Sequence, residues 1–138
     1  MNQERYLDFK TGDLRRQWRQ GQLHPALRVI VTAAARWHWL ATGKQAVVTS
    51  LLRTREQQRK IYPSSPGKRS PHEFGRAADM RVSLLHPGRA GDWARWLNEA
   101  FPYQGRTGLK TALVHEVGGR GNHIHVQVGP GETLPSQR

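Results

Sequence analysis

The chain has 138 residues, 36% of them hydrophobic and five of them tryptophan, so it is long enough for one packed domain with little room for a second. It contains no cysteine, which excludes a disulfide scaffold and any metal site built on thiolates. The formal net charge is +12, from 22 Lys and Arg against 10 Asp and Glu, and this excess predicts attraction to a polyanion: nucleic acid, an anionic membrane or an anionic cell wall.

Residues 1–22 are expected to be a polar lead-in with a short helix around DLRRQWRQ. The segment lacks the apolar stretch of a secretory signal, and no part of the chain approaches the roughly twenty apolar residues of a membrane span. We therefore expect a protein that is made in the cytoplasm, has no transmembrane segment, and reaches any target outside the membrane only after release.

A helix is expected over residues 25–42, PALRVIVTAAARWHWLAT. Pro25 suits the first turn, apolar residues recur at helical spacing, and Gly43 can end the helix. His38 lies in this helix between two tryptophans, and we expect it to have a packing role.

The β-rich stretch 45–52 predicts a strand, and residues 54–62 predict a helix in which Thr54 and Gln57 have the spacing of a capping box. Residues 63–71 contain three prolines and a glycine, which predict a loop. The later elements expected are a strand over 77–83, a helix over 92–101, strands over 109–117 and 123–128 joined by a Gly-rich turn over 118–122, and a frayed tail over 129–138. The helix should bury Trp93, Trp96, Leu97 and Phe101. The whole is α+β, one domain over residues 1–138 with a small antiparallel sheet flanked by helices.

The last strand carries two histidines on one face. Residues two apart in a strand point the same way, so His123 and His125 lie side by side. If residues 118–121 form the turn, Glu116 lies across from His123, and a one-residue slip would put His115 there instead. In the first register, a carboxylate and two imidazoles gather on one side of the sheet.

The segment SPHEFGRAAD, residues 70–79, supplies further ligands. His72 lies in the loop and Asp79 at the start of the next strand, and Gly75 allows a tight approach between them. Two His nitrogens and one carboxylate oxygen are a donor set of catalytic zinc sites, with a fourth position left for water. An H-E-x-x-H metalloprotease helix is excluded because position 76 is Arg.

This segment resembles the Ser-x-His-x-x-Gly-x-Ala-x-Asp signature of the zinc D-Ala-D-Ala carboxypeptidase family. That family includes phage L-alanyl-D-glutamate endopeptidase endolysins and shares its core with Hedgehog domains. The matching residues are Ser70, His72, Gly75, Ala77 and Asp79. NHIHV is similar to the closing strand of the family.

A third motif, TSLLRTREQQRKIY, is similar to the family segment that typically reads Ser-Gly-Tyr-Arg-Ser, followed by Gln and an apolar pair. The residues that fit it are Ser50, Arg53, Gln58, Ile61 and Tyr62. Together the three motifs span about residues 45–128, in the order the family has them.

The resemblance implies a Hedgehog/DD-peptidase-like fold and one zinc ion per chain, bound by His72, Asp79 and His125. It also implies that Arg53 lies near the substrate, where its guanidinium can pair with a peptide carboxylate or carbonyl. Ser70 would support substrate binding by hydrogen bonding. The alternatives are a solvated Arg53 and a Ser70 that only caps its loop.

The catalytic residues implied are Glu116 and His123. Several family members place an acidic base three residues before the last ligand, where this chain has Asn122, and a related branch uses the first His of the pair instead. We expect His123 to be the acid or the transition-state stabiliser, and Glu116 to be the base or the group that orients it.

The function implied is zinc-dependent hydrolysis of an amide bond in the peptidoglycan stem peptide, as an endopeptidase or a carboxypeptidase. A phage endolysin, released with a holin and acting on the cell wall as a monomer, fits the small size, and its basic surface would bind the anionic envelope. No stable nucleic-acid partner is expected. The alternatives are a basic nucleic-acid-binding protein with structural histidines, and a Hedgehog-like domain that binds zinc without catalysis.

Overall fold

The computed structural model describes residues 4–64, 67, 69–86, 88–104, 108–116 and 122–129, and this part of the chain is α+β. In chain order, its elements are β1 (Leu7–Phe9), α1 (Gly12–Arg19), α2 (Pro25–Thr42), β2 (Ala46–Ser50), α3 (Arg55–Ile61), the 3-10 helix η1 (Pro71–Phe74), β3 (Ala77–Arg81), α4 (Arg89–Ala100), β4 (Ala112–Glu116) and β5 (Asn122–Gln127). The tail predicted over 129–138 lies, apart from Gly129, outside the described residues.

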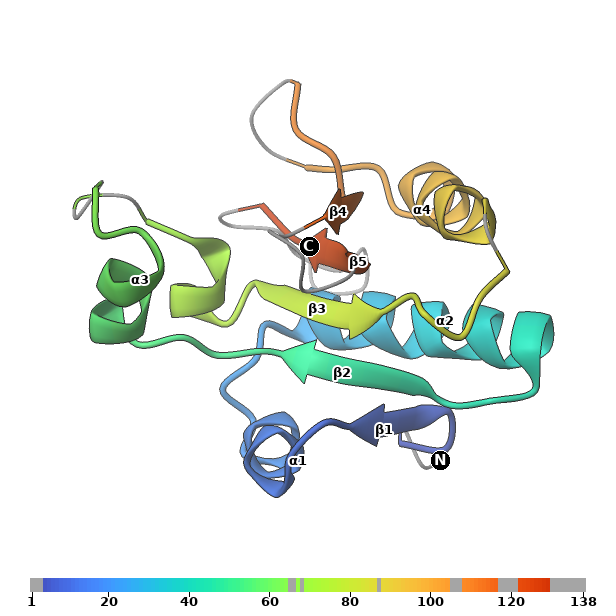
Figure 1. Ribbon diagram of the computed structural model, residues 1–138, viewed down its shortest axis with the longest axis horizontal. Coiled ribbons are helices and arrows are strands. Elements are labelled where there is room, and N and C mark those ends of the chain that lie inside the picture. Colours follow the sequence, from blue (N-terminus) through green and yellow to red (C-terminus); the bar gives the residue numbers. More distant parts are fainter. Residues whose placement is uncertain are drawn as a thin grey trace.

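The described strands form one mixed sheet in the order β1-β2-β3-β5-β4 (Figure 1). β1 and β2 are parallel, and the other neighbouring pairs are antiparallel. The expectation of an antiparallel sheet is therefore wrong at β1. A parallel pair needs a long crossover connection, and α1 and α2 together supply it between β1 and β2.

The described part of residues 1–22 is not a polar lead-in. Leu7 and Phe9 of β1, and Leu14 and Trp18 of α1, are all buried in the core. The residues of each pair lie on one face, because they are two apart in a strand or four apart in a helix. Polar residues around them make this pattern hard to see in the sequence. The short helix predicted in this segment is present as α1.

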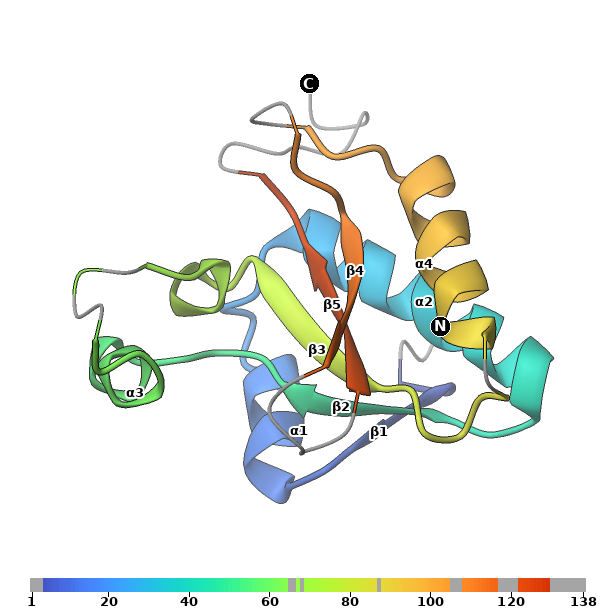
Figure 2. The same ribbon diagram turned by 45° about the horizontal axis from the view of Figure 1, so that its top comes forward.

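One face of the sheet packs against helices. α2 contacts β2, β3 and β5, while α4 contacts β4 and α2 (Figure 2). Val48, Met80 and Ile124, aligned on neighbouring strands, are fully buried in this layer. Because side chains alternate along a strand, Asp79 and His123 point to the opposite face, where the site lies.

The two helices of the core are joined by Trp93 of α4, whose indole N–H donates to a carbonyl of α2 at 3.1 Å. His38 is fully buried, with its Nδ1 2.9 Å from the carbonyl of Lys44 and its ring against Trp93, so it has the packing role predicted. Trp93 and Leu97 are buried as expected, but Trp96 is 38% exposed and its predicted burial is wrong.

The remaining elements begin and end close to their predicted limits. The capping box at Thr54 and Gln57 is present at the start of α3. The 3-10 helix η1, in contrast, occupies part of the motif segment for which only a loop was expected. None of the described helices combines the length and the apolar character needed to cross a membrane.

Candidate metal centre

His72 lies on η1, whose start is fixed by its own sequence. The Ser70 hydroxyl accepts from the backbone N–H of His72, and the Glu73 carboxylate accepts from the backbone N–H of Ser70. The His72 side chain is 2% exposed, with Nδ1 2.7 Å from the carbonyl oxygen of Leu51. A carbonyl can only accept, so Nδ1 carries a hydrogen, and in the neutral ring Nε2 presents its lone pair.

Asp79 lies in the middle of β3 and faces two histidines. Its Oδ2 is 3.3 Å from Nε2 of His72, and its Oδ1 is 2.9 Å from Nδ1 of His125. Burial raises the pKa of the Asp79 carboxyl, but when His125 and His72 are protonated, their hydrogen bonds and positive charge more than offset it. The pKa of Asp79 therefore lies well below its usual range, and the group is a carboxylate.

His125 lies on β5, directly across from Asp79 in the β3–β5 pair. Its outer nitrogen, Nε2, is 3.1 Å from the side-chain oxygen of Gln127. The amide nitrogen of Gln127 donates to the carbonyl of Lys110 at 2.8 Å, which turns the amide oxygen toward His125. Nε2 therefore carries a hydrogen, and Nδ1 of the neutral ring faces Asp79 with its lone pair.

Two imidazole nitrogens and both carboxylate oxygens thus face one another, which is favourable only with positive charge between them. Protons on the histidines can supply it, and so can a metal ion. The ligand atoms of His72, Asp79 and His125 all lie within 4.8 Å of one another. Each histidine also has its outer nitrogen held by an acceptor, as is usual for metal-binding imidazoles. These three side chains fit a metal ion, as predicted.

The β4–β5 hairpin has the alternative register. His115 pairs with His123 and Glu116 pairs with Asn122, so that residues 117–121, rather than 118–121, separate the paired ends. Because side chains alternate with a period of two, this shift brings His115 to the place expected for Glu116. The rings of His115 and His123 are stacked with centroids 5.5 Å apart. The side chain of Glu116 lies outside the described part of the structure.

His123 is the third histidine around Asp79, with Nε2 3.7 Å from Oδ2. Burial lowers the pKa of His123; the charge of Asp79 raises it, and the neighbouring histidines lower it again. The net direction is downward, so the ring is neutral near pH 7 and can accept a proton.

Arg53 reaches the same site from the segment between β2 and α3. Its Nη1 donates to the side-chain oxygen of Gln58 at 2.8 Å and to the hydroxyl of Ser70 at 3.4 Å. Its backbone N–H donates to the carbonyl of His72 at 3.1 Å. Gln58 is itself buried, so Arg53 is held beside the histidines rather than free in solvent. Ser70 both caps η1 and contacts Arg53.

One cleft of about 850 Å³ is lined by Arg53, Ser70, His72, Asp79, His115, His123 and His125, and Lys10 and Arg81 also line it. Asp79 is the one carboxylate among the described residues of its wall. A second groove, of about 560 Å³, lies between α4 and β4, and its described lining contains no histidine. The candidate chemistry therefore belongs to the first cleft.

Gln127 and Arg81 were not predicted as part of the site. Each lies two residues beyond a proposed ligand on the same strand, Gln127 after His125 and Arg81 after Asp79. The alternation of side chains that paired His123 with His125 would have placed them too. The carbonyl of Leu51, a backbone acceptor, left no signal in the sequence.

No protein-family model, no curated protein and no solved structure matches this chain, so its resemblance to a family depends on the three sequence motifs alone.

Proposed function

We propose that this chain is a zinc-dependent peptidase that hydrolyses an amide bond in the stem peptide of peptidoglycan, and that it serves as a phage endolysin. The observation that carries the proposal is the pair of imidazole nitrogens directed at the Asp79 carboxylate in an open cleft. Two histidines and one carboxylate suit catalytic zinc, which keeps a fourth position open. The motif resemblance adds peptidoglycan as the substrate and a Hedgehog/DD-peptidase-like fold.

Hydrolysis breaks the amide C–N bond and forms a C–O bond, while a proton from water moves to the leaving nitrogen. A zinc ion held by His72, Asp79 and His125 would supply a Lewis acid and lower the pKa of water. His123, neutral and beside these residues, can take up that proton and release it to the nitrogen, with Glu116 as the rival candidate. Arg53 would pair with a carboxylate or carbonyl of the substrate.

The charge of the chain agrees with a target in the cell envelope. A formal net charge of +12 attracts anionic polymers over long range. After holin-dependent release, this basic surface would keep the enzyme on the wall that it degrades.

Zinc-loaded protein, incubated with purified peptidoglycan and with a soluble stem peptide, tests the proposal by mass spectrometry of the products. We expect cleavage of one amide, lost together with zinc in His72→Ala, Asp79→Ala and His125→Ala. Asp13→Asn, an exposed change on α1, should alter neither the cleavage nor the zinc content. Full zinc occupancy in two of the three ligand variants would reject the ligand set. Zinc binding without cleavage would instead indicate a non-catalytic zinc domain.

The same charge favours a second function, binding of nucleic acid with the histidines in a structural role. Titration of metal-free protein with oligonucleotides at low and physiological salt tests it. Tight, strongly salt-dependent binding by a protein that cleaves no peptidoglycan would support this function over the first.

A further inference from the structure

Arg81 is a half-buried cation in the cleft, at the end of β3. It lies two residues beyond Asp79, on the same face of the sheet, and pairs across the strands with His123. Within the described part of the chain, its side chain forms no hydrogen bond and no ion pair. The described residues therefore leave its guanidinium available to a ligand that enters the cleft.

Lys10 adds a second cation from the β1 side of the cleft. Its backbone N–H donates to the carbonyl of Val48 at 2.9 Å, which fixes the start of the side chain beside β2. Among the described residues, the Lys10 ammonium has no ion pair. Arg19 on α1, in contrast, is neutralised by Glu4 at 2.8 Å. Within the described ranges, Lys10, Arg53 and Arg81 have no such carboxylate partner.

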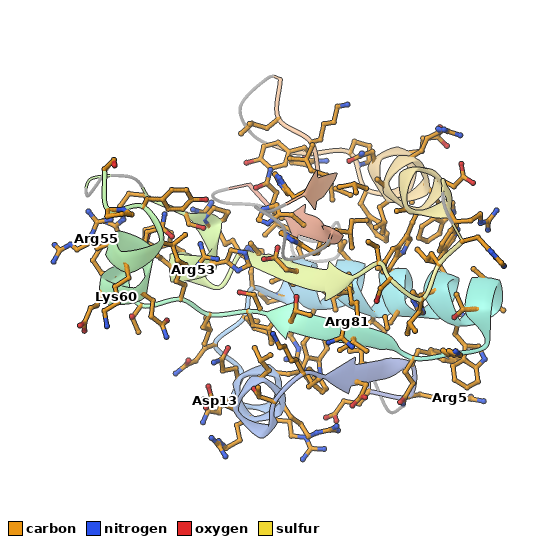
Figure 3. All side chains as sticks on the ribbon, viewed as in Figure 1. Arg5, Asp13, Arg53, Arg55, Lys60 and Arg81 are labelled. Carbon is orange, nitrogen blue, oxygen red and sulfur yellow. The ribbon has the colours of Figure 1, made fainter. Side chains whose placement is uncertain are left out.

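The unbalanced charge extends to both sides of the metal centre. Arg53 lies beside η1, before β3 begins, and Arg81 lies where β3 ends (Figure 3). Asp79 is the one carboxylate in the described wall between them, and both of its oxygens already face histidines. The potentials of several cations in a concave cleft add up, which raises the local concentration of anions.

We propose that the cleft binds a peptide with two carboxylates, one paired with Arg53 and the other with Arg81, so that the amide at the metal centre lies between them. The Arg81 subsite is the new element, and it rests on the proposed peptidase function only for the position of the amide. A peptide suits the wall better than single-stranded nucleic acid, which binds by stacking on aromatic side chains. Among the described lining residues, Tyr62 is the one aromatic side chain besides the histidines.

The test uses a peptide in which the central amide is replaced by a reduced bond that cannot be cleaved. Three forms are compared, one with both carboxylates free and two with one carboxylate amidated, and the Kd of each is measured by calorimetry on zinc-loaded protein. Amidation of the carboxylate proposed to pair with Arg81 removes a charge-assisted hydrogen bond and should weaken binding of the peptide to the wild type about tenfold. The same amidation should not change binding to Arg81→Gln, while the other amidation weakens both proteins alike.

Two further variants control for charge and folding. Arg16→Gln removes one exposed charge from α1 and should reproduce the wild-type pattern. Arg81→Lys keeps the charge without the planar fork, so amidation should weaken its binding by a factor between those for the wild type and Arg81→Gln. It replaces Arg81→Gln if that variant does not fold. Zinc content and thermal unfolding are measured for each protein.

If each amidation weakens binding to the wild type and to Arg81→Gln by the same factor, the Arg81 subsite is overturned, even if the natural amide is hydrolysed. Conversely, one amidation could weaken binding to the wild type but not to Arg81→Gln in a protein that hydrolyses no peptide. This result would support the subsite and reject the peptidase function. Displacement of the peptide by a single-stranded oligonucleotide at physiological ionic strength, from the wild type but not from Arg81→Gln, would overturn the peptide as ligand.

Discussion

The side-chain oxygen of Gln127 lies 3.1 Å from Nε2 of His125, and the Gln127 nitrogen lies 2.8 Å from the carbonyl of Lys110. These two hydrogen bonds determine which nitrogen of His125 carries the hydrogen, and so direct Nδ1 toward Asp79. An acceptor on the outer nitrogen also fixes the ring orientation and makes the inner nitrogen a stronger ligand. Gln127 therefore positions a proposed metal ligand without being one.

Gln127→Leu should lower zinc affinity by about ten- to a hundredfold, the usual effect of losing such an outer partner. Gln127→Glu keeps an acceptor and should restore most of the affinity. Competition with a chromogenic chelator measures the Kd. Gln20→Leu, an exposed change after α1, is the matched control. An unchanged Kd in Gln127→Leu would show that His125 does not need this partner.

The proposed ligands could be predicted from the sequence, but the hydrogen bonds that orient them and the hairpin register beside them could not. The strand period of two put His123 and His125 on one face, and the resemblance of the motifs to the family implied His72, Asp79 and His125 as the ligand set. The hairpin register depended on one residue of loop length, which a Gly-rich turn does not specify. That single residue decided whether Glu116 or His115 lay across from His123.

The N-terminal part of the fold was missed for a different reason. Only four apolar residues, Leu7, Phe9, Leu14 and Trp18, carry the burial of β1 and α1, and charged residues separate them. Short elements give too few repeats of a period to stand out against a polar background. Their burial depends on tertiary packing, which local composition does not reveal.

His123→Ala should retain zinc and lose on the order of a hundredfold in kcat on a soluble stem peptide, because it removes a proton acceptor but no ligand. Burial lowers the pKa of His123 below its ordinary 6.5. If His123 is the base, the wild-type rate should rise with pH through a value below 6.5, as the ring loses its proton, and then level off.

Two companion variants separate His123 from its neighbours in these assays. His115→Ala removes the stacked ring across the hairpin and should cost much less activity. Glu116→Gln tests the rival base. A large loss in Glu116→Gln, with near-normal rates in His123→Ala, would assign proton transfer to Glu116.

Glu73 should make the metal-free protein sensitive to acid. Its side chain is 3% exposed, and burial raises the pKa of Glu73, but the backbone N–H of Ser70 and the charge of Arg69 outweigh burial and lower it. A carboxyl with a lowered pKa stabilises the fold above its ordinary value of 4.5, and that stability is lost as the pH falls through the folded value.

Glu73→Gln keeps the capping oxygen but removes the charge, so its stability should fall less steeply below pH 4.5 than that of the wild type. Urea unfolding across the acid range measures the two slopes. Glu99→Gln, exposed on α4, is the control and should behave as the wild type. Parallel slopes for all three proteins would remove Glu73 from the acid response.

Gly75→Ala should destabilise the fold by about 2 kcal/mol or more. Gly75 has a φ of 68°, in the left-handed region, and a Cβ there would lie 2.5 Å from the carbonyl oxygen of Gln22. Gly12→Ala is the matched control, since nothing lies within 4 Å of its Cβ. Chemical denaturation measures both, and equal stabilities would mean that the chain relaxes around Gly75 without cost.

Arg53→Lys separates the geometry of Arg53 from the general positive charge of the chain. The planar guanidinium contacts both Gln58 and Ser70, and a lysine keeps the charge but cannot make this pair of directed hydrogen bonds. We expect kcat/KM on a soluble stem peptide to fall about tenfold or more, because a charge-assisted hydrogen bond at the substrate is lost. Zinc content should not change.

Wall binding, if the proposed function holds, should respond to the other property, the total charge. Charge reversals at Arg15 and Arg16 on α1, away from the cleft, should weaken binding to the envelope at low salt, because exposed charges act at long range and are screened by ions. The same reversals should leave cleavage of the soluble peptide normal. Pull-down with purified walls over a salt series, together with peptide kinetics, measures the two effects separately. Wild-type kinetics in Arg53→Lys would reduce Arg53 to one more surface charge, since the fork of its guanidinium would then have no role in binding the substrate.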